Sequence, residues 1–264
     1  MARSIGSSTI SFGLVSVPCK LYTSCSAEKV AFHLINAPTG NRLKQQYVDA
    51  VDGKIVPKED MIKGFEYAKD KCVTFSVEEI KGLEADRTNI IDIVEFIPAN
   101  SVDLVAVEKS YYLGPDKGAD KGYLLLSQIM DSEKVIAVGR WSTRGKDELV
   151  LVRSYRGGLI LHQMYYANEV RSFDEVFAGV AKIALSEKET NLGVKLIEQL
   201  SVDAFDPSKY ADEYAQRVIE AAQAKVAGGE IKMLPASTTV PMSDLFAALQ
   251  ASIDSAAKGK RKAG

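Results

Sequence analysis

Three consecutive apolar segments of strand length constrain the fold more than any other feature of the sequence. They read "KVIAVGRW" (134–141), "ELVLVRSY" (148–155) and "GLILHQMYY" (158–166), and turns that contain glycine separate them. Segments of this length, bounded by glycine and rich in Val, Ile and Leu, are typical of β-strands that contribute to a core. The turn "RGG" between the last two segments predicts a hairpin.

Similar segments occur earlier in the chain. "STISFGLVSVPCKLY" (8–22) alternates in part between apolar and polar residues, and "NIIDIVEFIP" (89–98) is rich in β-branched residues. "KGYLLLSQIM" (121–130) predicts a short helix. Many strands with few helices indicate a mainly β fold, in which the sheet closes into a barrel.

The stretch from Thr39 to Glu84 differs from these strands. It is polar, mixed in charge and broken by Gly and Pro, with only short strand-like pieces. Such a long excursion from a compact domain is usually functional or disordered.

The pattern becomes helical after about residue 175. Ser186 to Glu189 has the sequence of a capping box, in which side chains satisfy free amides of the first helical turn. Asp206 and Pro207 predict the start of a second helix, which Gly228-Gly229 would end. We therefore expect a core over 1–185, a helical arm over 186–234, and a linker, short helix and basic tail over 235–264.

The predicted short helix at about 243–256 has one apolar face and follows a linker that contains proline. That face either packs on the rest of the chain or docks on a partner. Its residues are Leu245, Phe246, Leu249 and Ile253.

Charge is sorted along the chain, although the 264 residues carry a net charge of only −2. Residues 139–158 hold five bases and two acids, whereas residues 187–230 hold nine acids and five bases. Arg binds phosphate through two parallel hydrogen bonds, so clustered arginines can form a phosphate track. Arginines on an exposed hairpin can equally be solvated, and counting residues leaves both interpretations open.

The sequence shows no pattern typical of catalysis. Its three cysteines lack CxxC spacing, which fits a reducing cytoplasm and predicts neither zinc nor disulfides. His33 and His162 lie in apolar segments and are interpreted as structural. "GPDKGADKG" (114–122) lacks the GK[ST] ending of a phosphate loop. No apolar segment has the 18 or so residues that cross a bilayer. We expect no enzyme activity, no cofactor, no metal and no membrane association.

Seven phrases, in order over roughly residues 3–255, resemble the bacterial Ku family of DNA-end-binding proteins. One phrase would be weak evidence, but seven in order are specific. They are "STISFGLVSVPCKLY", "KGFEY", "DIVEFIP", "SYYLGPDKGADKGYLLL", "GLILHQMYYANEVR", "FDPSKYADEYAQRVIEAAQAKVAGGE" and "SDLFAALQASI".

The resemblance implies a β-barrel core, a bridge inserted in it at about 40–90, and a C-terminal α-helical arm that embraces a second subunit. Two subunits would form a homodimeric ring that threads onto a double-stranded DNA end without reading its sequence. The ring would act in non-homologous end joining, recruiting and stimulating an ATP-dependent ligase, ligase D, in the cytoplasm at the nucleoid.

The resemblance also implies which basic residues face DNA. The short C-terminal tail departs from longer relatives. So does "YVDAVDG" (47–53), with Val48 and Val51 where many relatives have the cysteines of a CxxCG knuckle, and no zinc is predicted there. The residues carried over are Arg42, Lys44, Lys54, Lys63, Lys81, Arg140 and Arg144, with Arg3 at the barrel entrance.

Two other classes of function stay open. One is a barrel adaptor that binds a partner protein through the C-terminal helix and touches DNA only weakly. The other is an enzyme for a phosphorylated small molecule. Preference for linear over closed circular duplex would favour the ring over both.

Overall fold

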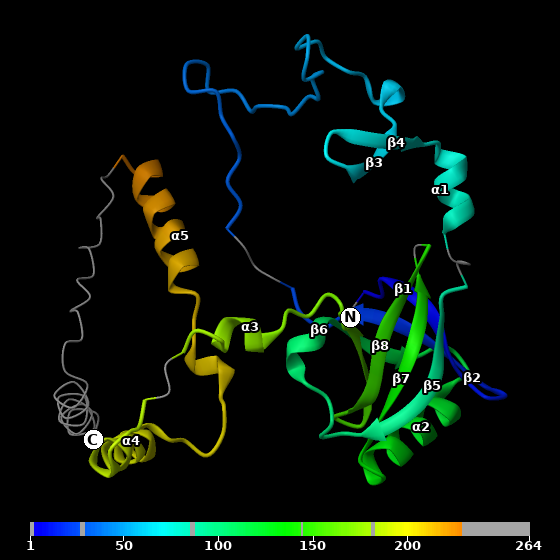
Figure 1. Cartoon of the computed structure of the whole chain (residues 1–264), viewed down its shortest axis with the longest axis vertical. Coiled ribbons are helices and arrows are strands. Elements are labelled where there is room, and N and C mark those ends of the chain that lie inside the picture. Colours follow the sequence, from blue (N-terminus) through cyan, green and yellow to red (C-terminus); the bar gives the residue numbers. More distant parts are fainter. Residues whose placement is uncertain (1–2, 27–29, 85–87, 144, 181–182, 229–264) are drawn as a thin grey trace. The chain divides into compact units, whose positions relative to one another are not determined.

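Seven strands close into a barrel in the computed structural model, which describes residues 3–26, 30–84, 88–143, 145–180 and 183–228 (Figure 1). The strand order is β1-β2-β6-β9-β8-β7-β5. Neighbours run antiparallel except β1 and β5, whose parallel pairing closes the wall. The predicted mainly β barrel is confirmed. Its strands are β1 (Gly6–Phe12), β2 (Val15–Thr23), β5 (Ile90–Pro98), β6 (Val107–Pro115), β7 (Val135–Thr143), β8 (Lys146–Tyr155) and β9 (Gly158–Met164).

The barrel core follows from the alternation of the strands. Val150 and Val152 on β8 are fully buried, and so is Leu161, which pairs with Val152 from β9. Because successive side chains on a strand point to opposite faces, Leu151 points away from this core, and it is buried in a second, smaller apolar cluster with Ile136 and Met164. The predicted "RGG" hairpin is confirmed by the pairing of Tyr155 with Gly158.

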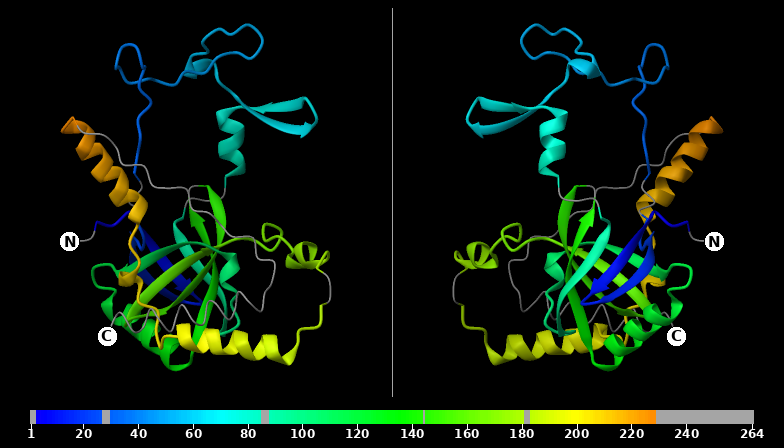
Figure 2. Two further views of the ribbon diagram at one scale, coloured as in Figure 1. Left: turned by 90° about the vertical axis from the view of Figure 1, so that its left-hand side faces the viewer. Right: turned by 90° about the vertical axis from the view of Figure 1, so that its right-hand side faces the viewer.

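One helix, α2 (Asp120–Ser132), packs against the barrel, as both side views of Figure 2 show. Its buried face includes Tyr123, Leu126 and Met130, which join the barrel core. The Tyr123 hydroxyl accepts a hydrogen bond from the Leu159 amide at 2.8 Å, so the helix is also bonded to β9. The helix predicted at 121–130 is thereby confirmed. The crossing between β5 and β6 contains a short 3-10 turn, η2 (Leu104–Ala106).

The predicted bridge lies in the insertion between β2 and β5, residues 24–89, for which we keep the name bridge. It contains η1 (Lys58–Asp60), the two-stranded sheet of β3 (Lys63–Ala68) and β4 (Lys71–Phe75), and α1 (Val77–Leu83). None of its described residues is buried. The excursion therefore has secondary structure but no core of its own.

The C-terminal region is helical, with α3 (Phe173–Phe177), α4 (Glu187–Leu200), η3 (Pro207–Lys209) and α5 (Glu213–Val226). The described residues from Phe173 to Gly228 group into a unit apart from the barrel and most of the bridge. The Ser186 capping box is confirmed, with both of its hydrogen bonds present. None of the helices in the described ranges is both long and apolar enough to cross a bilayer.

The predicted start of the second helix at Pro207 is wrong. Asp206 caps only the single turn of η3, and the chain is extended again at Tyr210. Asp212 then caps α5 through the Ala215 amide at 3.1 Å. Two Asp residues six positions apart can each begin a helix, and the downstream one begins the long helix here. The helix predicted at 243–256 lies outside the described residues.

Candidate nucleic-acid interface

Five of the eight predicted DNA-contacting residues lie on the bridge, and all five are exposed. The bridge elements distribute them along its length. Arg42 forms a single antiparallel β-pair with Ile35 outside the named strands. Lys63 begins β3, and Lys81 lies in the last turn of α1. The remaining two are Lys44 and Lys54.

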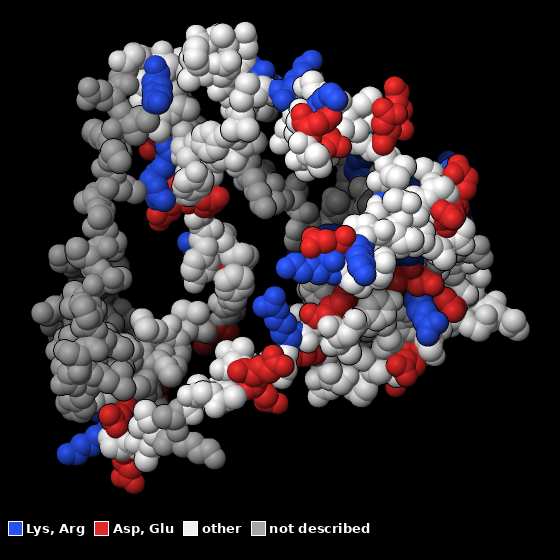
Figure 3. Space-filling model, turned by 45° about the horizontal axis from the view of Figure 1, so that its top comes forward, with Lys and Arg blue, Asp and Glu red and all other residues white. Residues whose placement is uncertain are grey.

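The bridge has no surplus of positive charge. From Arg42 to Lys81 the sequence has eight bases and eight acids. Figure 3 shows the consequence on one face of the molecule, where Lys and Arg lie among Asp and Glu instead of forming a field of one sign. Whether the bridge can bind a row of phosphates therefore depends on which of its charged side chains are already paired within the bridge, not on its net charge.

Half of these eight carboxylates are engaged by the bridge itself. Asp49, Glu66 and Glu79 accept hydrogen bonds from bridge amides, and Asp52 accepts one from the Lys54 amide. Among the described residues, Lys54 is the only one of the eight bases that forms an ion pair. Four of the eight carboxylates are thus turned toward local amides, while seven of the eight cations have no ion-pair partner among the described residues and are available to an external anion.

Two turns of the bridge have the same backbone hydrogen bonds, thirteen residues apart. In the first, the Gly40 amide donates to Asn36 O at 2.8 Å; in the second, the Gly53 amide donates to Asp49 O at 2.9 Å. Both glycines have φ of +71°, which favours Gly over other residues. The shared pattern [Asn/Asp]-Ala-x-x-Gly marks this repeat in the sequence, a signal that was not among the predictions above.

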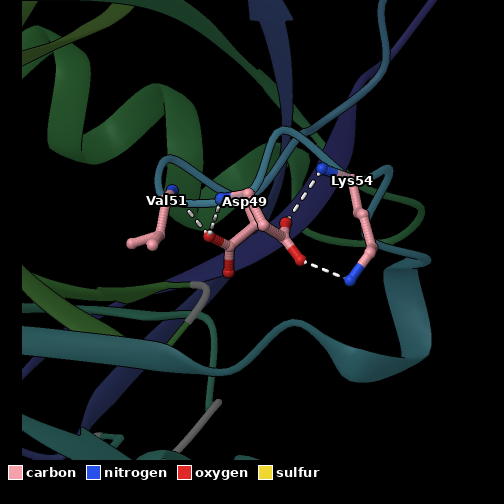
Figure 4. Close-up of polar contacts among 4 residues, drawn as sticks. Asp49, Val51 and Lys54 are labelled. Atoms are coloured by element: carbon pink, nitrogen blue, oxygen red, sulfur yellow. Dashed lines mark hydrogen bonds and ion pairs between the residues drawn. The ribbon is translucent and has the colours of Figure 1, made fainter.

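The second turn contains the stretch "YVDAVDG" that the family resemblance aligns with a CxxCG knuckle. Its glycine is Gly53, so the positions of the two cysteines are Asp49 and Asp52, not Val48 and Val51 as interpreted from the sequence. Figure 4 shows how this turn closes without thiolates. Asp49 Oδ1 accepts from the Val51 amide at 2.7 Å, and Asp52 Oδ2 lies 2.7 Å from Lys54 Nζ.

These residues do not fit a knuckle zinc site, because both carboxylates are engaged and neither residue supplies a thiolate. The hydrogen bond from the Lys54 side chain holds the pKa of Asp52 below its ordinary value. Among the described residues, no three His, Cys, Asp or Glu side chains converge as a metal site would require.

The arginine-rich stretch 139–158 does not form one cluster. Arg140 is exposed on β7, opposite Asp92 of β5 and Leu149 of β8. Arg144 lies outside the described residues. Arg153 and Arg156 lie at the other end of β8, beside the turn to β9. Arg140 pairs with Leu149 in the middle of β8, Arg153 lies four residues farther along that strand, and Arg156 lies in the turn beyond it. Of these three described arginines, only Arg140 belongs to the predicted DNA-facing loop.

The remaining predicted residues are peripheral or undescribed. Arg3 is exposed in the coil before β1. The four apolar residues of the C-terminal helix, from Leu245 to Ile253, lie outside the described part of the chain.

The two histidines differ. His162 is structural as predicted, since its Nδ1 lies 2.7 Å from Ser110 Oγ and its Nε2 accepts from Arg153 Nε at 3.0 Å. Burial, and then the Arg153 charge, hold the pKa of His162 below its ordinary value. His33 is exposed on the bridge, so its interpretation as a structural histidine is wrong.

Comparison with known proteins gives one consistent result. The family model for the Ku70/Ku80 beta-barrel domain matches residues 11–192. Proteins named "Non-homologous end joining protein Ku" are similar over nearly the whole chain. One from Paraburkholderia phymatum is 38% identical over 98% of this chain and 85% of its own length. Others from Heliobacterium modesticaldum (35%; 99% and 95%) and Archaeoglobus fulgidus (32%; 96% and 98%) are similar. With a closed seven-stranded barrel and a family model that matches most of the sequence, the chain belongs to the Ku family.

Proposed function

We propose that this chain binds the ends of double-stranded DNA, without sequence preference, in non-homologous end joining. One observation carries the proposal. A Ku barrel bears an inserted bridge whose exposed cations, Lys54 excepted, have no ion-pair partner among the described residues. The role is one of binding, with no catalytic step.

Phosphate contacts explain why such binding ignores sequence. Contacts from Lys and Arg to the DNA backbone fix position but carry no sequence information. The bridge cations lie on a hairpin, a helix and two turns, and the described helix of the bridge, α1, carries a single base, Lys81.

The protein acts as a homodimeric ring in this proposal, and the helical arm makes the dimer. Helices α4 and α5 bury none of their residues within the chain. Their apolar side chains include Ile197 and Leu200, which are both about two-thirds exposed. An exposed face of this kind is typical of an element that packs on a second subunit.

The C-terminal segment recruits and stimulates an ATP-dependent DNA ligase, the ligase D of the family. Its support is the apolar pattern of Leu245, Phe246, Leu249 and Ile253 beyond a proline-containing linker. Deletion of residues 236–264 is expected to leave end binding intact and abolish stimulation of ligation. As a control, the variant Leu249→Asp in the full-length chain keeps the basic tail and disrupts only the apolar face of this segment. Full stimulation by the truncated protein would assign the segment to packing on the chain's own body.

A competition experiment tests the ring directly. A labelled linear duplex is bound, and unlabelled linear or closed circular duplex is added. A ring threads only onto ends, so the linear competitor is expected to displace the label and the circle is not. Equal competition would leave the barrel adaptor with weak DNA contact as the better function.

The dependence of binding on salt tests the phosphate contacts. If each subunit neutralises about four phosphates, a dimer neutralises about eight, and log K against log salt has a slope near −7. A slope shallower than about −2 would mean that the bridge cations are not used.

A further inference from the structure

Four residues form an aromatic and cationic surface on the outer wall of the barrel, at the turn from β8 to β9. We call Tyr112, Arg153, Tyr155 and Arg156 the turn patch. The ring of Tyr112 stacks on that of Tyr155, with centroids 5.9 Å apart and planes at 17°. The Cζ atoms of Arg153 and Arg156 each lie 5.3 Å from the centroid of Tyr155. One ring thus holds two full positive charges close together.

The core does not explain this arrangement. Val152, which precedes Arg153, is fully buried, so the alternation of the strand turns Arg153 and Tyr155 outward. Arg156 is exposed in the turn itself.

Arg153 is held in one orientation by its neighbours. Its Nε donates to His162 Nε2 at 3.0 Å, and its Nη1 donates to Ser154 O at 3.2 Å. A guanidinium can only donate, so His162 is neutral and its Nδ1–H donates to Ser110 Oγ at 2.7 Å. A guanidinium fixed in this way loses little conformational freedom when it binds a ligand.

Arg156 occupies an unfavourable backbone conformation. Its φ is +51°, and the following Gly157 has φ of +81°. A two-residue hairpin turn with both φ values positive strongly favours Asn, Asp or Gly at its first position. The chain nevertheless has an arginine there, with its guanidinium over Tyr155. A strained residue that also carries a charge is an indication of function.

Neither guanidinium has an acidic partner within the described ranges. Two such charges over one ring repel each other unless an anion binds. Guanidinium groups match the geometry of phosphate oxygens, and they retain their charge at any physiological pH.

The turn patch is bonded to the start of the bridge. Ser110, which holds His162, accepts a hydrogen bond at its carbonyl from Ser24 Oγ at 2.7 Å. Ser24 is the first residue of the bridge after β2. This continuity with the segment that carries the other unpaired cations favours DNA over an acidic protein as the occupant.

We propose that the turn patch is an additional phosphate contact for duplex DNA, made by the barrel wall and separate from the bridge contacts. This rests on the proposed function, because it takes the duplex to be the ligand. It adds Arg153 and Arg156 to the residues expected to bind backbone phosphates.

The variant Arg156→Gly tests the proposal in the full-length protein. Glycine fits a positive φ, so the melting temperature is expected to stay the same or rise. Removing one phosphate contact from each subunit should make the salt slope for a mixed-sequence duplex shallower by about 0.9 per subunit, or about 1.8 for a dimer. The double variant Arg153→Gln/Arg156→Gly should double that change. The matched control is Arg217→Gln, which removes an arginine paired with Glu213 on α5 and should leave the slope unchanged.

The outcomes separate this proposal from the ring. An unchanged slope in both variants overturns it, and so does a normal slope combined with loss of ligase stimulation, which would assign the patch to a protein partner. A shallower slope supports the turn patch proposal even if closed circles compete as well as linear duplex. That competition result would refute only the end binding, not the phosphate contact. If the unmodified protein binds no duplex at all, both proposals fail.

Discussion

The barrel and the helical arm use apolar residues at equally regular spacing, but only the barrel covers them. Val152 and Leu161 are fully buried in the barrel, whereas Ile197 and Leu200 on α4 are mostly exposed. The bridge resembles the arm in this respect, since none of its described residues is buried. Periodicity therefore predicts that an element forms, but not whether its apolar face is satisfied within the same chain.

This contrast separates a part of the molecule that covers its own apolar residues, the barrel, from two parts that do not, the bridge and the arm. The barrel is a self-sufficient fold with its own core and a helix packed on it. In the proposed function, the bridge and arm present side chains that gain partners from other molecules, DNA in one case and a second subunit in the other. The four predictions that follow test this division, from the largest expected effect to the smallest.

The cysteines give the sharpest contrast between barrel and bridge. Cys19 on β2 is fully buried, and burial raises its pKa to about 12, whereas Cys72 on β4 and Cys25 are exposed. Because the thiolate is the reactive form, Cys19 in the native protein should react with a thiol reagent at least about a thousandfold more slowly than Cys72. Mass spectrometry should find Cys25 and Cys72 modified first, with Cys19 modified only in denaturant. Comparable rates for all three would contradict a closed barrel.

Truncation of the same residue type in each region should separate their contributions to stability. Leu161→Ala empties part of the core and should lower the free energy of unfolding by about 2–5 kcal/mol. Leu83→Ala on the bridge helix α1 removes a side chain that is 76% exposed. It should change the free energy of unfolding by less than about 0.5 kcal/mol. Denaturant titrations measure both. Similar losses would mean that the bridge has a core of its own.

The arm should respond in assembly and not in folding. Ile197→Asp places a charge on the exposed face of α4, and burying that charge in a dimer is costly. We expect the dissociation constant of the dimer to rise at least tenfold, which corresponds to about 1.4 kcal/mol of binding free energy. The melting temperature of the barrel should stay unchanged. Sedimentation over a range of concentrations measures this, with Lys195→Ala as the control. A variant that stays fully dimeric would remove the arm from the interface.

A smaller effect is expected from pH, through His162. Its pKa is lowered in the folded protein, so between the lowered value and 6.5 the unfolded chain binds more protons than the folded one. Stability should therefore fall as pH decreases below about 6.5. In His162→Gln that part of the dependence should be lost. A pH profile that is identical in the two proteins would mean that His162 titrates normally.

Much of the fold could be predicted because local signals and global structure agree. The β8–β9 hairpin is marked by its turn, and α4 by the capping box at Ser186. The start of α5 could not be predicted, because Asp206-Pro207 and Asp212 are both good starting signals and the choice between them depends on the conformation of the intervening residues.

The candidate site was less accessible to sequence reasoning. Counting bases along 139–158 joined Arg140, which lies opposite the middle of β8, with Arg153 and Arg156 near the turn to β9. Counting also treated Lys54 like the other bridge cations, although Asp52 pairs with it in the folded turn. The engagement of carboxylates by nearby amides depends on backbone geometry, which composition does not contain.

The parallel pairing that closes the barrel has a mechanical consequence. The bridge leaves at the end of β2 and returns at the start of β5, and β1 lies hydrogen-bonded between these two strands. A force that pulls on the bridge draws both strands in the same direction along β1. The force then acts on many hydrogen bonds at once, in shear, and does not peel them apart one at a time. In the proposed function, a bridge anchored in this way can hold a DNA end under tension without loosening the barrel that supports it.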